Sequence, residues 1–127
     1  MSKLRITNSQ GAVLADRAEI ADTSAKRRTG LLKHSRLEPG EGLWIAPCEG
    51  VHTFFMKFPI DVLFLSKQKK VLKVRHRMVA WRMAMSFRAH SVLELPAGIA
   101  EATGTSAGDV LTFEKYDAGG VPPGGRV

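Results

Sequence analysis

The alternation of apolar and polar positions along the chain predicts many short strands and few helices. Residues 43–46, 51–56 and 60–65 are short apolar stretches, and their aromatic and β-branched residues favour strands. Residues 71–79 alternate between apolar and polar side chains, which is the period of a strand with one buried face. On this pattern Leu72, Val74 and Met78 share one face, and three cations share the other. Further strands are predicted at residues 4–7, 12–15, 91–95 and 110–114.

Two helices are predicted between these strands. The first covers residues 24–33, begins after Asp22 or Thr23 as N-cap, and contains Gly30. The second is short, covers residues 97–103, and ends at Gly104. The links between the central strands are too short for a parallel crossover, so neighbouring strands should be antiparallel. We therefore expect a mainly β (α+β) fold, a compact antiparallel sandwich or jelly-roll-like barrel with one N-terminal helix.

Length and composition indicate one folded unit with a tail. The chain has 127 residues, which fits one domain. We expect residues 1–116 to form a single globular domain. Residues 117–127 read DAGGVPPGGRV, and their glycines and prolines leave little apolar surface to bury. This segment is therefore predicted to be a disordered tail.

The chain contains a single cysteine, which excludes an internal disulfide and favours a reducing compartment. The N-terminus lacks the apolar stretch of a signal peptide, and no apolar run approaches the length of a membrane span. We therefore expect a soluble cytoplasmic protein.

The net charge of +7 comes from one part of the chain. Residues 67–90 contain eight Lys and Arg and no acid, which is typical of a surface that attracts anions or of a solvated cationic face. Lys73, Arg75 and Arg77 are alternate residues of the predicted strand, so their spacing of about 6.6 Å is close to that of phosphates along a single strand. With Arg82, they are the predicted contacts for an anionic ligand or a nucleic-acid backbone.

Cys48, His52 and Asp61 are the candidate catalytic residues. A thiol and an imidazole four residues apart could serve as nucleophile and base, with Asp61 to orient them, or as metal ligands. Because further ligands at suitable spacing are absent from the sequence, we predict no structural metal and no cofactor. The alternative is structural. Cys48 would be an inert buried thiol and His52 a core residue beside Phe54 and Met56.

In the same structural alternative, Asp61 would be a buried carboxylate held by hydrogen bonds. We expect its donors to be backbone N–H groups of residues 57–59, or its partner to be Lys57 or Arg82. Glu94 also lies inside an apolar strand, and we interpret it in the same way.

Several separated motifs resemble a known family. They are Arg28-x-Gly30-Leu31, Gly42-Leu43, Pro47-Cys48, His52-Thr53-Phe54-Phe55-Met56, Pro59-Ile60-Asp61-Val62-x-Phe64-Leu65, Leu93-Glu94-Leu95-x-Ala97-Gly98 and Gly108-Asp109. Together they are similar to the family of uncharacterised proteins called domain of unknown function 192. The resemblance implies a compact, mainly antiparallel β fold of jelly-roll-like kind with one clasping helix. It implies no established activity, cofactor or substrate. It directs attention to four shared positions that folding does not obviously require: Cys48, His52, Asp61 and Arg82.

Three functions remain open from the sequence. The first is a non-catalytic binding module for an anionic ligand, a polyanion or a protein partner. The second is an enzyme that uses Cys48, His52 and Asp61 for acyl or thiol chemistry. The third is an accessory protein whose shared residues only maintain the fold.

Overall fold

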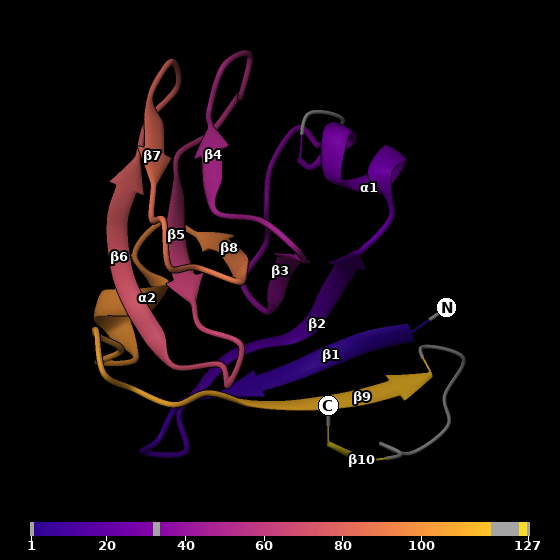
Figure 1. The fold of residues 1–127 in the computed structure, drawn as a ribbon, viewed down its shortest axis with the longest axis vertical. Coiled ribbons are helices and arrows are strands. Elements are labelled where there is room, and N and C mark those ends of the chain that lie inside the picture. Colours follow the sequence, from indigo (N-terminus) through magenta and orange to yellow (C-terminus); the bar gives the residue numbers. More distant parts are fainter. Residues whose placement is uncertain (1, 32–33, 118–124, 127) are drawn as a thin grey trace.

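The computed structural model describes residues 2–31, 34–117 and 125–126 and is built mainly from strands (Figure 1). Its elements, in chain order, are β1 (Ser2–Thr7), β2 (Val13–Ala21), α1 (Ser24–Thr29), β3 (Glu41–Ile45), β4 (Gly50–His52), β5 (Ile60–Leu65), β6 (Val71–Met78), β7 (Met83–Met85), β8 (Ser91–Pro96), α2 (Ile99–Ala102), β9 (Thr112–Asp117) and β10 (Gly125–Arg126). The mainly β fold with short helices is thus confirmed. The tail predicted to be disordered falls mostly at residues 118–124 and 127, outside the described residues.

Eight strands form one sheet in the order β10-β9-β1-β2-β3-β8-β5-β6, and β4 pairs with β7 in a second, two-stranded sheet (Figure 1). Neighbouring strands are antiparallel except β2 and β3, which run parallel. The parallel pair was not specified by the sequence, which indicated a mainly antiparallel fold. It is possible because residues 22–40, which include α1, form a crossover long enough to return the chain.

The large sheet curls so that the start of β6 meets the segment before β9. Val71 N–H donates to Asp109 O, and Leu111 N–H donates to Lys69 O, at 2.7 and 2.9 Å. Lys70 and Val110 form an isolated antiparallel bridge at the same place. The strand order is that of an open sheet whose corners touch, and it does not confirm the expected jelly-roll-like barrel.

Two core clusters cover the two faces of this sheet. β5 is buried along its whole length, and its side chains alternate between the faces. The first core cluster lies inside the curl and includes Leu4, Ile6, Leu14, Trp44, Leu63, Leu65, Leu93, Leu95, Ala100 and Phe113. The second core cluster lies between the sheet and the layer formed by α1, β4 and β7, and includes Leu31, Leu43, Ile45, Ile60, Val62, Phe64, Met78, Ala84 and Val92.

The first helix is shorter than predicted. The Thr23 side chain caps α1 by accepting a hydrogen bond from the Lys26 backbone N–H, as the sequence suggests. Gly30 is not inside the helix but terminates it, with φ of 49°. A left-handed φ is accessible to glycine at little cost, so backbone conformation rather than close packing explains this glycine. Residues 32–33 of the predicted helix lie outside the described part of the chain.

The predicted shared face of the cationic residues on β6 is wrong. Arg75 pairs with Val62 and Met78 pairs with Ile60, so an irregularity in β6 inserts one extra residue between these pairs. Because such a bulge reverses the alternation, Met78 joins the second core cluster, whereas Val74 packs against the first.

The bulge also separates the cations. Lys73 Nζ donates to Met85 O at 3.0 Å, on the side of β7. The Arg77 side chain lies instead at α2, where a guanidinium nitrogen is 3.9 Å from a carboxylate oxygen of Glu101. Lys73 and Arg77 therefore do not belong to one continuous row. Lys73 and Arg75 stay predicted contacts for an anionic ligand, and Arg82 is exposed in the loop before β7.

Candidate functional site

A cleft of about 560 Å³ lies beside α1, between this helix and the segment formed by the end of β3 and β4. Its wall includes two of the predicted catalytic residues, Cys48 and His52, together with Glu94 and the guanidinium-bearing residues Arg27 and Arg28. β3 and β4 are joined by the short link that contains Cys48, and this link brings the thiol and His52 to the same cleft.

Asp61 does not belong to this cleft. It alternates with Ile60 and Val62 of the second core cluster, so its side chain points to the opposite face of the sheet. There it is fully buried. The predicted arrangement of Cys48, His52 and Asp61 in one site is therefore not present.

Asp61 is held by three backbone N–H groups. Its Oδ1 accepts hydrogen bonds from Arg77 and Gly98 at 2.9 and 3.1 Å, and its Oδ2 accepts one from Ala100 at 2.8 Å. These donors belong to the end of β6 and the start of α2, not to residues 57–59. Neither Lys57 nor Arg82 is its partner. A carboxylate with three N–H donors fastens three segments that are distant in the sequence.

Cys48 is half-buried on the cleft wall, and its thiol donates a hydrogen bond to Gly50 O at 3.1 Å. Burial raises the pKa of Cys48, and the nearby charge of Glu94 raises it further, whereas the charge of Arg27 acts in the opposite direction. The net upward shift disfavours the thiolate, which is the nucleophilic form.

His52 is the exposed last residue of β4, because the strand is shorter than predicted and ends there. Its ring lies 4.8 Å from the Phe54 ring, centre to centre. Among the described residues no hydrogen bond joins His52 to Cys48. The imidazole is thus available to a ligand in the cleft but is not arranged as the base of a thiol nucleophile.

Glu94 is the residue whose importance the sequence did not reveal. It is only 5% exposed, and its strand neighbours Leu43 and Val62 are both apolar. Burial raises the pKa of Glu94 from 4.5 to about 7. No hydrogen bond or ion pair joins its carboxyl group to another residue in the described part of the chain. A buried carboxyl group without a partner, on the wall of a cleft, is typical of a functional site.

Arg27 and Arg28 bring positive charge to the same cleft. Arg27 Nη1 donates to the carbonyl oxygens of Asp22 and Ala46 at 3.0 and 3.4 Å, which directs the side chain from α1 toward the end of β3. Within the described ranges, neither guanidinium forms an ion pair with a carboxylate. The cleft therefore combines two cations that form no ion pair among the described residues with a carboxyl group whose pKa burial raises to about 7.

The described residues contain no group of three or more His, Cys, Asp or Glu side chains suited to hold a metal ion. The absence of a structural metal stays a prediction, tested below. No helix in the part of the chain that the structure describes is long and apolar enough to cross a membrane.

Two relatives have similar sequences over most of this chain. A UPF0127 protein of Thermococcus sibiricus is 31% identical over 118 residues, which cover 86% of this chain and 73% of the relative. The UPF0127 protein PYRAB11210 of Pyrococcus abyssi is 32% identical over 115 residues, which cover 85% of this chain and 95% of the relative. These names state no activity.

Two solved structures have a similar fold. A protein of Sinorhizobium meliloti, provisionally described as a transcription regulator, gives a TM-score of 0.78 at 22% identity and covers 89% of this chain and 94% of its own. A protein of unknown function from Novosphingobium aromaticivorans gives a TM-score of 0.74 at 24% identity, and the match covers 85% of this chain and 81% of that protein. At these identities the likeness concerns the fold.

The family domain of unknown function 192, described as Uncharacterized ACR, matches residues 5–113. This range contains the cleft residues, the Asp61 hydrogen bonds and both core clusters except Leu4. The chain belongs to this uncharacterised family.

Proposed function

We propose that this chain is a non-catalytic binding module whose ligand is a small molecule with an anionic group and a hydrogen-bonding group. The observation that carries the proposal is the cleft beside α1. There the buried Glu94 carboxyl group, which has no hydrogen-bond or ion-pair partner among the described residues, lies in the same wall as Arg27 and Arg28, neither of which forms an ion pair there.

The chemistry of the three side chains defines the ligand. A carboxylate or phosphate is matched by Arg27 and Arg28, because guanidinium groups bind such oxygens with paired N–H donors. Glu94, with a pKa of about 7, donates a hydrogen bond when protonated and accepts one when charged. It therefore suits a hydroxyl or amino group on the same ligand. Hydroxy acids, amino acids and small phosphorylated alcohols all have this combination.

Binding should be measured by calorimetry with L-malate, L-serine and glycerol 3-phosphate as probes and glycerol as the neutral control. We expect at least one anionic probe to bind, and Arg27→Gln/Arg28→Gln to weaken it at least tenfold, because a hydrogen bond to a charged group contributes about 1.5–3 kcal/mol. Lys67→Gln/Lys70→Gln is the matched control, since it removes the same charge from exposed positions outside the cleft.

Two results would contradict the proposal. In the first, no anionic probe binds at millimolar concentration. In the second, the control variant weakens binding as much as the cleft variant, which would show that only net charge matters. A Glu94→Gln variant adds a separate readout. Ligand binding to the wild type should change the number of bound protons, measured in buffers of different ionisation enthalpy, and this change should disappear in the variant.

Acyl or thiol chemistry is the second candidate function, and one observation favours it. Glu94 has the pKa of about 7 that a general acid or base needs, and its charge acts on the neighbouring Cys48. The raised pKa of the thiol and the position of Asp61 on the other face of the sheet favour binding over catalysis.

A further inference from the structure

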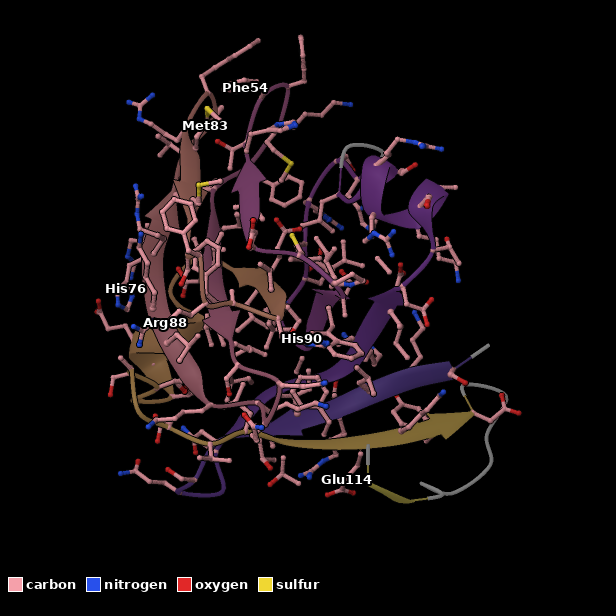
Figure 2. The ribbon with its side chains drawn as sticks, in the orientation of Figure 1. Phe54, His76, Met83, Arg88, His90 and Glu114 are labelled. Atoms are coloured by element: carbon pink, nitrogen blue, oxygen red, sulfur yellow. The ribbon has the colours of Figure 1, made fainter. Side chains whose placement is uncertain are left out.

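A second surface, unrelated to the cleft chemistry, collects most of the exposed apolar side chains. Eight large hydrophobic residues are exposed in the described part of the chain, and six of them belong to β7 and to the loops around β4 and β7. We call this set the β4–β7 apolar surface: Phe55, Val79, Trp81, Met83, Met85 and Phe87. β4, β7 and their loops project at one end of the molecule (Figure 1), and Phe54 and Met83 lie at that end (Figure 2).

The loops that carry Phe55 and Trp81 are held together by Thr53. The Thr53 N–H donates to Arg82 O at 2.9 Å, and the Trp81 N–H donates to Thr53 O at 3.1 Å. The Thr53 hydroxyl donates to Val79 O at 2.6 Å and accepts from the Arg82 N–H at 2.9 Å. Thr53 therefore fixes the position of the two loops relative to each other.

The aromatic side chains of these loops are pre-arranged. Phe55 and Trp81 both have positive φ, 66° and 64°, a strained conformation for large side chains that tends to mark functional segments. Trp81 stacks on Phe54 with ring centres 5.6 Å apart and meets Phe55 edge-on at 4.8 Å. Phe55 and Trp81 nevertheless remain 69% and 57% exposed. Folding alone does not explain large apolar side chains held outward in this way.

The charge around the β4–β7 apolar surface is mainly positive. Residues 50–58 and 79–88 contain no acid, and the one acid between Glu49 and Glu94 is the buried Asp61. Lys57, Arg82 and Arg88 are exposed within these segments. A projecting apolar surface is thus bordered by several cations, and the exposed acid beside it is Glu49, whose backbone oxygen accepts from the Ser86 N–H.

We propose that the β4–β7 apolar surface docks on a membrane that contains anionic phospholipids. Its aromatic and methionine side chains would enter the boundary between headgroups and acyl chains, and Lys57 and Arg82 would contact the lipid phosphates. Charge complementarity favours an anionic partner. The projecting shape favours a bilayer over a nucleic acid, because a single-stranded nucleic acid binds in a groove along which its bases stack on aromatic side chains.

Sedimentation with vesicles tests the docking. Vesicles of phosphatidylcholine with phosphatidylglycerol should bind the protein, and vesicles of phosphatidylcholine alone should bind it far more weakly. Of the two tryptophans, Trp44 is 9% exposed and Trp81 is 57% exposed. The emission should therefore shift to shorter wavelength on binding, and Trp81→Phe should remove the shift while retaining most of the binding.

Four variants separate the contributions of apolar and charged side chains. Phe55→Ser/Trp81→Ser should abolish binding, and Val13→Ser/Val110→Ser should not, because those two valines are exposed outside the surface. Lys57→Gln/Arg82→Gln should weaken binding about 30-fold, since each cation near an anionic surface contributes about 1 kcal/mol. Lys67→Gln/Lys70→Gln, with the same net charge, should change it much less. Circular dichroism verifies that each variant is folded.

Three results would overturn the proposal. Wild-type protein could fail to sediment with anionic vesicles. The Phe55→Ser/Trp81→Ser variant could bind as the wild type does. The surface could instead bind a single-stranded oligonucleotide or a second copy of the chain, with the same variant losing that contact while vesicles bind neither protein. Loss of cleft binding in Arg27→Gln/Arg28→Gln leaves the vesicle result unaffected, so the two proposals can fail independently.

Discussion

Replacing Asp61 with alanine should destabilise the protein strongly, because it removes one acceptor group from three donors. The carboxylate is fully buried and joins the end of β6 to the start of α2 through the N–H groups of Arg77, Gly98 and Ala100. The helix has no side-chain N-cap of its own. Asp61 therefore supplies the capping interaction from another strand.

The expected magnitude follows from these three bonds. A buried donor left without an acceptor costs about 1–3 kcal/mol. That cost applies in full to Ala100, whose bond is buried, and in part to Arg77 and Gly98, whose bonds are partly buried and reachable by water. We expect Asp61→Ala to lower the free energy of unfolding by about 3–5 kcal/mol, the range for breaking a buried charged interaction. Asp61→Asn should cost less, because it keeps an oxygen for Arg77 and Gly98.

Urea unfolding followed by circular dichroism measures this effect. With a slope of about 2 kcal/mol per molar urea, the midpoint should fall by about 2 M. Asp16→Ala is the control, because that carboxylate is half-exposed and pairs with Arg17 on the surface. Its free energy of unfolding should change by less than about 0.5 kcal/mol. An unchanged midpoint for Asp61→Ala would refute the assigned structural role.

Four further predictions concern the cleft, metal content and surface charge. Because the pKa of Glu94 is raised from 4.5 to about 7, the folded protein retains a proton that the unfolded chain releases. The free energy of unfolding should therefore fall as pH rises from 4.5 to about 7, by on the order of 3 kcal/mol, and equal pH slopes for Glu94→Gln and wild type would exclude this. Because burial raises the pKa of Cys48, iodoacetamide should alkylate it more slowly at pH 7 than it alkylates glutathione, whereas faster reaction would support a nucleophile. Elemental analysis of the purified protein should find no stoichiometric zinc, and one zinc per chain would disprove this. Retention on heparin should fall more with Lys73→Ser/Arg75→Ser than with Arg77→Ser/Lys67→Ser, because the Arg77 side chain lies at α2. Equal losses would indicate that Lys73, Arg75 and Arg77 do form one row of cations.

The sequence predicts the central strands β5 and β8 well because their apolar patterns are continuous, whereas β2, predicted at residues 12–15, runs over Val13–Ala21. β5 begins and ends where its pattern predicts, at Ile60 and Leu65, and β8 differs from its prediction by one residue. The predicted end of a strand is wrong where side-chain hydrogen bonds outweigh the local preference of the residues for a strand. β4 ends at His52 because Thr53, next in the chain, uses its hydroxyl and backbone to bind the loop before β7.

The candidate site was predictable only in part. The cysteine link and His52 do line one cleft, as their short spacing suggests. The contribution of Glu94 was hidden, because the sequence pattern of an acid in an apolar strand is the same whether backbone donors hold the acid or it lies buried at the wall of a cleft. The same pattern therefore describes Asp61, which three backbone N–H groups hold, and Glu94, which lines the cleft. The approach of Arg27 depends on the crossover between the parallel strands β2 and β3, which the short-range pattern does not specify.

The pairing of β1 with β9 also affects how the chain folds while it is being synthesised. β1 lies between β2 and β9, and Ser2 is opposite Asp117 in register. A ribosome makes β1 first, but the partner on one of its edges exists only after residues 112–117 have emerged. During that interval the nascent chain presents an unpaired strand edge that can join another chain. Premature termination before β9 would therefore yield an aggregation-prone fragment, and chaperone binding to the growing chain should persist until its last strands are made.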